Sequence, residues 1–198
     1  MTIAVVNSGG ANISSVLHAL HRLGAEPVFT DDAERIRSAD HVILPGVGAA
    51  GHAMEVLREK QLLDVIRNLR QPVIGICLGM QLLFESSEED NAELLGIIPA
   101  RLERLPEREG LRVPHMGWNA IATWGEDHLT RELDGNWFYF VHSYAAPIGP
   151  WTLATSSHGV PFSAMVRSDN FCGAQFHPER SAGAGADLLR AFLETPLQ

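Results

Sequence analysis

Short apolar runs alternate with amphipathic stretches through the first half of the chain. Apolar strands are expected at 3–6, from Pro27, at 41–44 and at 72–74. Between them, apolar residues recur at helical spacing over 14–23, a short helix starts at Asp31-Asp32, and further helices are expected over about 52–68. Short buried strands that alternate with helices predict an α/β fold of flavodoxin-like type, with a mostly parallel central sheet and helices on both faces.

The second half has a different pattern. Segments between 100 and 166 are shorter, with a strand expected at 137–141, and we expect these strands to join the sheet in antiparallel orientation. A strand at 173–176 and a helix over 182–193 close the chain. The acidic run 85–90 is expected to be a solvated loop. There is no internal repeat or linker, so residues 1–198 are expected to form a single domain.

One strand runs directly into the pentapeptide 75–79, Gly-Ile-Cys-Leu-Gly, and a helix is expected over 80–84. This order is typical of a nucleophile elbow, the G-x-S-x-G turn of hydrolases, with Cys77 in place of serine. Glycines on both sides remove Cβ atoms that would crowd the turn, and the helix N-terminus favours thiolate over thiol. An isolated cysteine is more often buried and structural. The glycine frame favours a nucleophile at Cys77, whereas Cys172 lacks that frame and is expected in the core.

A base for the sulfur is found near the C-terminus. His177 precedes a proline, which biases its backbone toward extended geometry, where residues two apart point to the same side. His177 and Glu179 would therefore project together, and the carboxylate could hold the imidazole tautomer and stabilise the imidazolium. Cys77, His177 and Glu179 are thus a candidate nucleophile, base and orienting acid. The alternative role for Glu179 is that of an ordinary carboxylate at a helix start.

Composition limits the possible partners. Fifteen basic and 24 acidic residues give a net charge of −9, and no basic cluster is present, which argues against nucleic acid or an anionic membrane as partner. Two cysteines cannot form a disulfide framework, and no stretch has the basic start of a leader or the ~20 apolar residues of a membrane span. We expect a soluble cytoplasmic protein without a metal or cofactor.

Five segments, in order along almost the whole chain, resemble landmarks of the class I glutamine amidotransferases. The elbow extended to 85 and the Gln-Phe-His-Pro-Glu segment at 175–179 are typical of the superfamily. The segments Pro-Gly-Val-Gly at 45–48, Val-Pro-His-Met-Gly-Trp-Asn at 113–119 and Phe-Val-His-Ser-Tyr at 140–144 resemble one branch, the glutaminase subunits of imidazole glycerol phosphate synthase. The resemblance implies that glutamine is hydrolysed to glutamate and ammonia through a thioester on Cys77, for histidine biosynthesis.

The resemblance also implies roles for residues around the triad. Backbone N–H groups would meet the oxyanion; they are expected from Leu78 after the nucleophile and from Val47 and Gly48. Gln81 lies one helical turn beyond Cys77 and so faces the same side. The residues expected to contact glutamine are Gly46, Gln81, Ser143 and Tyr144.

The family partner is a cyclase subunit with a (β/α)₈ barrel, which would receive the ammonia in a heterodimer. Asn12, Trp118, Asn119 and Arg180 are candidates for that interface; the alternative is a surface loop beside a packed tryptophan. The chain departs from the family pattern in the loop from Asn7, at Ala145 and at Arg180, positions that bear on loop and partner contact rather than on the triad.

Three functions are compatible with these residues. The first is the amidotransferase. The second is another class I amidotransferase or a thiol hydrolase on the same elbow, such as a peptidase or γ-glutamyl hydrolase. Release of ammonia from glutamine in the partner's presence would separate this function from the first. The third is a non-catalytic binding subunit, against which the intact triad argues; labelling by a glutamine-like electrophile tests it.

Overall fold

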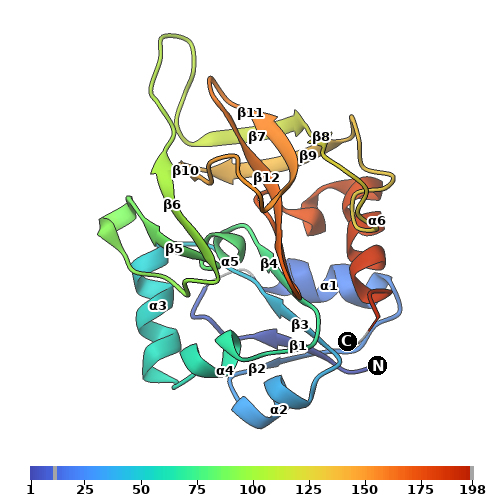
Figure 1. Cartoon of the computed structure of the whole chain (residues 1–198). Coiled ribbons are helices and arrows are strands. Elements are labelled where there is room, and N and C mark those ends of the chain that lie inside the picture. Colours follow the sequence, from blue (N-terminus) through green and yellow to red (C-terminus); the bar gives the residue numbers. More distant parts are fainter. Residues whose placement is uncertain (11–12, 197–198) are drawn as a thin grey trace.

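The computed structural model describes residues 1–10 and 13–196 (Figure 1). An eight-stranded sheet in the order β2-β1-β3-β4-β13-β12-β11-β8 forms the centre. Its strands are β1 (Ile3–Val6), β2 (Pro27–Thr30), β3 (His41–Leu44), β4 (Val73–Ile76), β8 (Ala122–Thr123), β11 (Thr152–Ser157), β12 (Pro161–Ser168) and β13 (Phe171–Ala174). The helices are α1 (Ser14–Arg22), α2 (Ala33–Ser38), α3 (Ala50–Glu59), α4 (Leu63–Arg67), α5 (Leu78–Gln81) and α6 (Ala182–Leu193).

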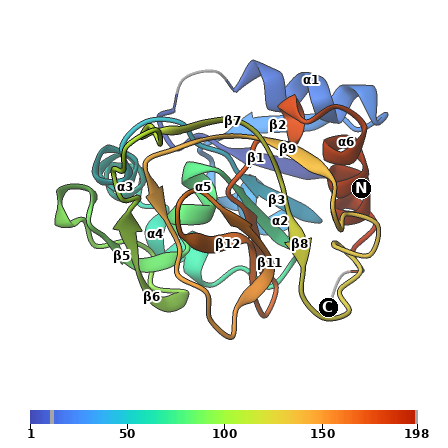
Figure 2. The same ribbon diagram turned by 90° about the horizontal axis from the view of Figure 1, so that it is seen from above.

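The first five strands of this order are parallel. Four of them, β1, β3, β4 and β13, are buried on both faces, whereas the edge strand β2 exposes Val28 and Phe29. Successive residues of a strand face opposite sides, so Ile3 and Val5 pack with α1 and α6, whereas Ala4 and Val6 pack with α2, α3 and α4. The helices accordingly lie in two layers on either side of the sheet (Figure 1 and Figure 2). This confirms the predicted doubly covered parallel sheet.

The predicted antiparallel additions are also present. Strands β12, β11 and β8 extend the sheet in antiparallel orientation. Two smaller sheets lie above: β7 (His115–Ala120) pairs with β9 (Trp137–His142), and β6 (Ile98–Arg104) lies between β5 (Phe84–Ser87) and β10 (Tyr144–Ala145). Figure 2 shows β7 and β9 side by side.

Two local predictions were wrong. The helix expected over 80–84 is α5, which begins at Leu78 and ends at Gln81, because Phe84 pairs with Ile98 to start β5. The acidic run 85–90 is not a free loop: it contains part of β5 and then a 3₁₀ turn, Glu89–Asn91. Glu89 accepts a hydrogen bond of 2.7 Å from the N–H of Ala50 and so caps α3, where a carboxylate is favourable.

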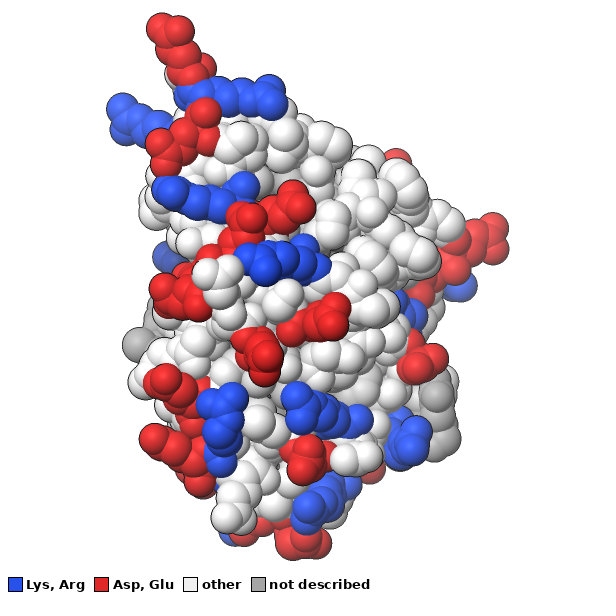
Figure 3. All heavy atoms as spheres, turned by 60° about the vertical axis from the view of Figure 1, so that its left-hand side comes forward, with Lys and Arg blue, Asp and Glu red and all other residues white. Residues whose placement is uncertain are grey.

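The charged side chains do not form a patch of one sign on the face shown in Figure 3, where basic and acidic groups are interspersed. Arg104 and Glu107, for example, form an exposed ion pair of 2.7 Å. Within residues 1–10 and 13–196, no helix combines the length and the apolar character needed to cross a membrane.

The two elbow glycines are required by close backbone contact. A Cβ on Gly75 would collide with the backbone of Gly79 and Met80, and a Cβ on Gly79 would collide with the Leu44 carbonyl of β3. Helix α5 therefore lies directly on β3 and β4, closer than any side chain at these two positions allows.

We predict that Gly79→Ala lowers the free energy of unfolding by about 3 kcal/mol, because the sheet must move to admit the methyl group. Urea denaturation measures this change. The matched control is Gly183→Ala, in helix α6, where a Cβ meets nothing within 4 Å. That variant should be neutral or gain about 0.5–1 kcal/mol, and equal losses in both variants would contradict the packing argument.

Candidate active site

Three adjacent parallel strands end at the predicted site. Strand β4 lies between β3 and β13, so the loop after β3, Cys77 after β4 and His177 after β13 meet at one edge of the sheet. Ligands of such sheets bind at this carboxyl edge. The parallel order thus brings together residues that are 100 positions apart in the sequence.

Cys77 has the backbone conformation of a nucleophile elbow. Its φ is 51° and its ψ is −107°, a region that side chains rarely adopt, and its N–H donates to the Ala174 carbonyl at 2.8 Å. The sulfur lies 3.6 Å from the Val141 carbonyl oxygen and 3.8 Å from Nε2 of Gln175. The strained turn and these contacts hold the sulfur at the cleft wall.

His177 and Glu179 are paired as predicted, although by a different backbone route. Nδ1 of His177 lies 2.8 Å from Oε1 of Glu179, and both side chains are 6% exposed. His177 is extended, but residues Pro178–Arg180 form a 3₁₀ turn, so the expected extended chain ends at the proline. The turn brings the carboxylate back to the ring.

Charge explains the protonation of His177. Burial alone would lower its pKa, but hydrogen bonds and charge attraction from Cys77 and Glu179 raise the pKa of His177 to about 10. The imidazolium is therefore stable at neutral pH. Because Nδ1 faces the carboxylate, Nε2 is the nitrogen left to interact with the sulfur, and its positive charge stabilises a thiolate there.

The triad opens onto a cleft of about 340 Å³. Ten of the predicted residues line it: Val47, Gly48, Cys77, Leu78, Gln81, Ser143, Tyr144, His177, Glu179 and Arg180. Gly46 is not in that lining; a Cβ at this position would lie 2.9 Å from the side chain of Leu78. A volume of this size suits a small-molecule ligand.

The predicted oxyanion donors lie at the cleft beside the sulfur. Among the described residues, no group accepts a hydrogen bond from the N–H of Gly48 or Leu78. Gly48 has φ of +112°, and a Cβ there would meet nothing, so its glycine is required by backbone conformation rather than by space. Both N–H groups are thus available for a ligand.

Gln175 is a site residue that sequence reasoning missed. It is fully buried, donates to the Cys77 sulfur through Nε2 and accepts from Nε2 of Gln81 at 3.1 Å. Gln81 also donates to the Tyr144 carbonyl at 3.1 Å, which leaves its own carbonyl oxygen for a ligand. Gln175 lies directly after the end of β13, and no local pattern in the sequence indicated its hydrogen bonds to Gln81 and Cys77.

The predicted partner residues divide into two kinds. Trp118 is 50% exposed and contacts Tyr139, over whose ring the Arg180 guanidinium lies at 5.0 Å. Asn119 instead uses its amide inside the protein, donating to His115 and to the Ser157 carbonyl. Asn12 lies outside the described residues.

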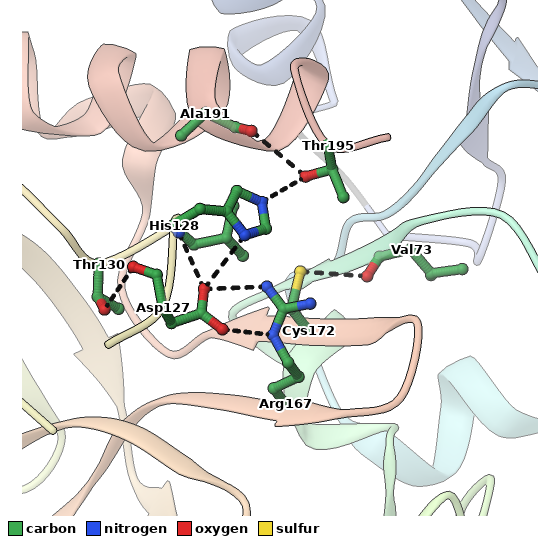
Figure 4. Close-up of polar contacts among 9 residues, drawn as sticks. Val73, Asp127, His128, Thr130, Arg167, Cys172, Ala191 and Thr195 are labelled. Atoms are coloured by element: carbon green, nitrogen blue, oxygen red, sulfur yellow. Dashed lines mark hydrogen bonds and ion pairs between the residues drawn. The ribbon is translucent and has the colours of Figure 1, made fainter. Parts of the chain in front are cut away.

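Cys172 is buried, as predicted, and lies far from the triad chemistry. Its sulfur donates to the Val73 carbonyl at 3.3 Å, and burial raises its pKa to about 12 (Figure 4). The same view shows the two-bond ion pair of Asp127 and Arg167, which fixes the loop after β8 to β12. This cluster therefore has a structural role.

Comparisons with known proteins identify the family. The family model "Glutamine amidotransferase class-I" matches residues 4–195. Solved structures share the fold at low identity: a glutamine amidotransferase aligns with a TM-score of 0.75 and 22% identity over 96% of this chain and 97% of that one. PurLQS from Thermotoga maritima aligns with a TM-score of 0.75 and 20% identity over 97% of each chain. Fold and site thus define a class I glutamine amidotransferase.

Curated relatives narrow the family. Imidazole glycerol phosphate synthase subunit HisH of Yersinia pseudotuberculosis is 50% identical over 196 residues, covering 98% of this chain and 100% of the relative. The HisH subunit of Idiomarina loihiensis is 49% identical over 197 residues, with 100% of each covered. The chain therefore belongs to the HisH family of glutaminase subunits.

We predict that Glu179→Gln slows alkylation of Cys77 by iodoacetamide severalfold at pH 9, because loss of the carboxylate lowers the pKa of His177 and the imidazolium is then lost at a lower pH than in wild type. In wild type the imidazolium is kept until the pH rises toward 10. Intact-protein mass spectrometry follows the reaction. Cys172→Ser is the matched control and should leave the rate unchanged; equal rates for Glu179→Gln and wild type would contradict this role of the carboxylate.

Proposed function

We propose that the chain hydrolyses the side-chain amide of glutamine at Cys77 and supplies the ammonia to a cyclase partner that forms imidazole glycerol phosphate. The observation that carries the proposal is the buried set of Cys77, His177 and Glu179 at the wall of a cleft of about 340 Å³. A positioned thiolate with an imidazolium beside it supports acyl transfer from an amide.

The first chemical step is attack of the Cys77 sulfur on the amide carbon. The imidazolium of His177 then gives its Nε2 proton to the departing nitrogen, which leaves as ammonia, and the glutamyl group remains as a thioester. In the second step His177 accepts a proton from water, which attacks the thioester and releases glutamate. Glu179 holds the ring through Nδ1 in both steps.

The oxyanion of each tetrahedral intermediate would be stabilised by backbone donors. Leu78 and Gly48 line the cleft together with Cys77, and one backbone N–H donor of this kind typically supplies ~3 kcal/mol of transition-state stabilisation. The carbonyl oxygen of Gln81 suits the substrate's α-ammonium group. Ser143 and Tyr144 supply the facing wall.

The partner surface is proposed to be the outer face of β7 and β9. Met116 and Trp118 are 63% and 50% exposed, and they lie opposite Val141 and Tyr139. Val141 also lines the cleft, so this apolar face reaches the active site. A cyclase barrel seated here would receive ammonia without its release to solvent, and exposed aromatic residues of this kind are typical of interface centres.

We predict that Cys77→Ala abolishes imidazole glycerol phosphate synthesis from glutamine while leaving synthesis from added ammonia intact, because the nucleophile is needed only to release ammonia. Coupled assays of the chain with its cyclase partner measure both activities. Cys172→Ala is the control and should retain both. Loss of both activities in Cys77→Ala would instead indicate a structural role.

We predict that Trp118→Ala weakens partner binding by about 2 kcal/mol, or roughly thirtyfold in Kd, since a central tryptophan contributes that much at an interface. Isothermal titration calorimetry against the cyclase subunit measures it. Trp124, which is also 50% exposed but follows β8 at the edge of the main sheet, provides the matched control Trp124→Ala. The interface is misplaced if the two variants lose affinity equally or only the control does.

A further inference from the structure

Two buried histidines outside the triad lie against the cleft wall. His115 begins β7 and His142 ends β9, and the two residues are paired in register. Their side chains are buried, and Nδ1 of His115 lies 3.0 Å from Nε2 of His142. His142 also lines the cleft. The glutaminase chemistry described above uses neither ring.

Neighbouring groups fix the proton positions on both rings. Nδ1 of His142 lies 2.9 Å from the Tyr144 carbonyl oxygen, which can only accept, so this nitrogen carries a proton. In a neutral ring the Nε2 of His142 is then an acceptor. Nδ1 of His115 must therefore donate to it, which leaves Nε2 of His115 as an acceptor.

Asn119 supplies the donor that this arrangement requires. Its Nδ2 lies 3.3 Å from Nε2 of His115. The orientation of the amide is fixed independently, because Nδ2 also donates to the Ser157 carbonyl at 2.9 Å while Oδ1 accepts from the Ala120 N–H at 2.9 Å. In the series of hydrogen bonds that runs from Asn119 through His115 and His142 to the Tyr144 carbonyl, every donor therefore faces an acceptor.

A further proton on either ring would place two donors face to face. Burial, reinforced by the neighbouring imidazoles, lowers the pKa of His115 to about 4 and that of His142 to about 3. Both rings are thus neutral near pH 7, in agreement with the hydrogen-bond directions.

The Tyr144 carbonyl links the hydrogen-bonded histidines to the glutamines beside Cys77. It accepts from His142 on one side and from Nε2 of Gln81 on the other. The second N–H of Gln81 donates to Gln175, which in turn donates to the Cys77 sulfur. Displacement of this one carbonyl would therefore reorient Gln81, the residue proposed above to bind the substrate's α-ammonium group.

We propose that His142 and His115 are positioning residues for glutamine: as a directed pair of neutral imidazoles anchored by Asn119, they fix the Tyr144 carbonyl and through it the orientation of Gln81. This inference rests on the glutaminase function proposed above. It assigns the pair to substrate binding and not to activation of the sulfur, so binding of glutamine and reactivity of the thiolate should respond differently to its loss.

Two substitutions at His142 distinguish the role of its N–H donor from the role of the bulk of its ring. His142→Phe keeps the bulk and removes the donor, whereas His142→Asn keeps an N–H near the position of Nδ1. The matched control is His158→Asn. The His158 ring stacks on His115 at 4.2 Å, but its hydrogen bond among the described residues goes to the Arg112 carbonyl, outside the directed pair. His115→Phe interrupts the pair from its other end.

The test uses the full chain with its cyclase partner. It measures KM for glutamine and the labelling rates of Cys77 by iodoacetamide and by a diazoketone analogue of glutamine. We expect His142→Phe and His115→Phe to raise KM for glutamine and to slow labelling by the glutamine analogue, each by about tenfold. This is the effect expected from the loss of one buried hydrogen bond. Iodoacetamide labelling should stay within about twofold of wild type, His142→Asn should retain most of the affinity, and His158→Asn should match wild type.

The proposal is overturned if both reagents slow equally, if KM is unchanged in the phenylalanine variants, or if His158→Asn has the same effect. Wild-type protein that reacts with iodoacetamide but neither with the glutamine analogue nor with glutamine would refute the proposed function instead. Nitrogen-15 spectra of histidine-labelled wild-type protein then show which nitrogen of each ring carries the proton, independently of the activity assays. They should show both rings protonated at Nδ1 alone, and a proton on Nε2 of either ring would overturn the directed pair.

Discussion

The close backbone contact between α5 and the sheet is the constraint on which the site depends. Gly79 lies against the Leu44 carbonyl, and Gly75 lies against the start of α5, with no room for a Cβ at either position. The chain can leave β4 only through a tight turn, which forces Cys77 to a φ of 51°. That turn places the sulfur directly above the sheet edge, between the loop after β3 and His177 after β13.

The second determinant is the placement of charge. Helix α5 has a single turn of four residues, so its dipole contributes at most a few tenths of a kcal/mol to 1 kcal/mol. The imidazolium of His177, buried and bonded to Glu179, is the stronger stabiliser of a thiolate. Neutral dipoles support the sulfur and Gln81 from the other side, among them Gln175 and the two neutral histidines. Glu89 and Arg180 also line the cleft, so charge there is not limited to the triad.

Much of this arrangement was predictable from the sequence. The parallel strands, the elbow and the pairing of His177 with Glu179 follow from apolar runs, glycine positions and spacing, because these are local signals. The end of α5 was not predictable, since it depends on pairing of Phe84 with Ile98 across the chain. The roles of Asn119 and Gln175 were likewise missed, because hydrogen bonds between distant segments leave no periodic trace in a sequence.

Strand β7 connects the proposed partner surface to the site through its alternation. Met116 and Trp118 point outward, whereas His115 and Asn119 point inward to the cleft wall. A partner that contacts Trp118 therefore binds to the same strand, β7, that carries His115 and Asn119 of the directed histidine pair. No intervening loop or hinge is needed, because successive residues of one strand belong to the two surfaces. A shift of β7 normal to its plane would act on the Tyr144 carbonyl through His142. It would also act on the triad through β9, whose Val141 carbonyl lies 3.6 Å from the Cys77 sulfur and whose Tyr139 carbonyl accepts from the His177 N–H at 2.9 Å.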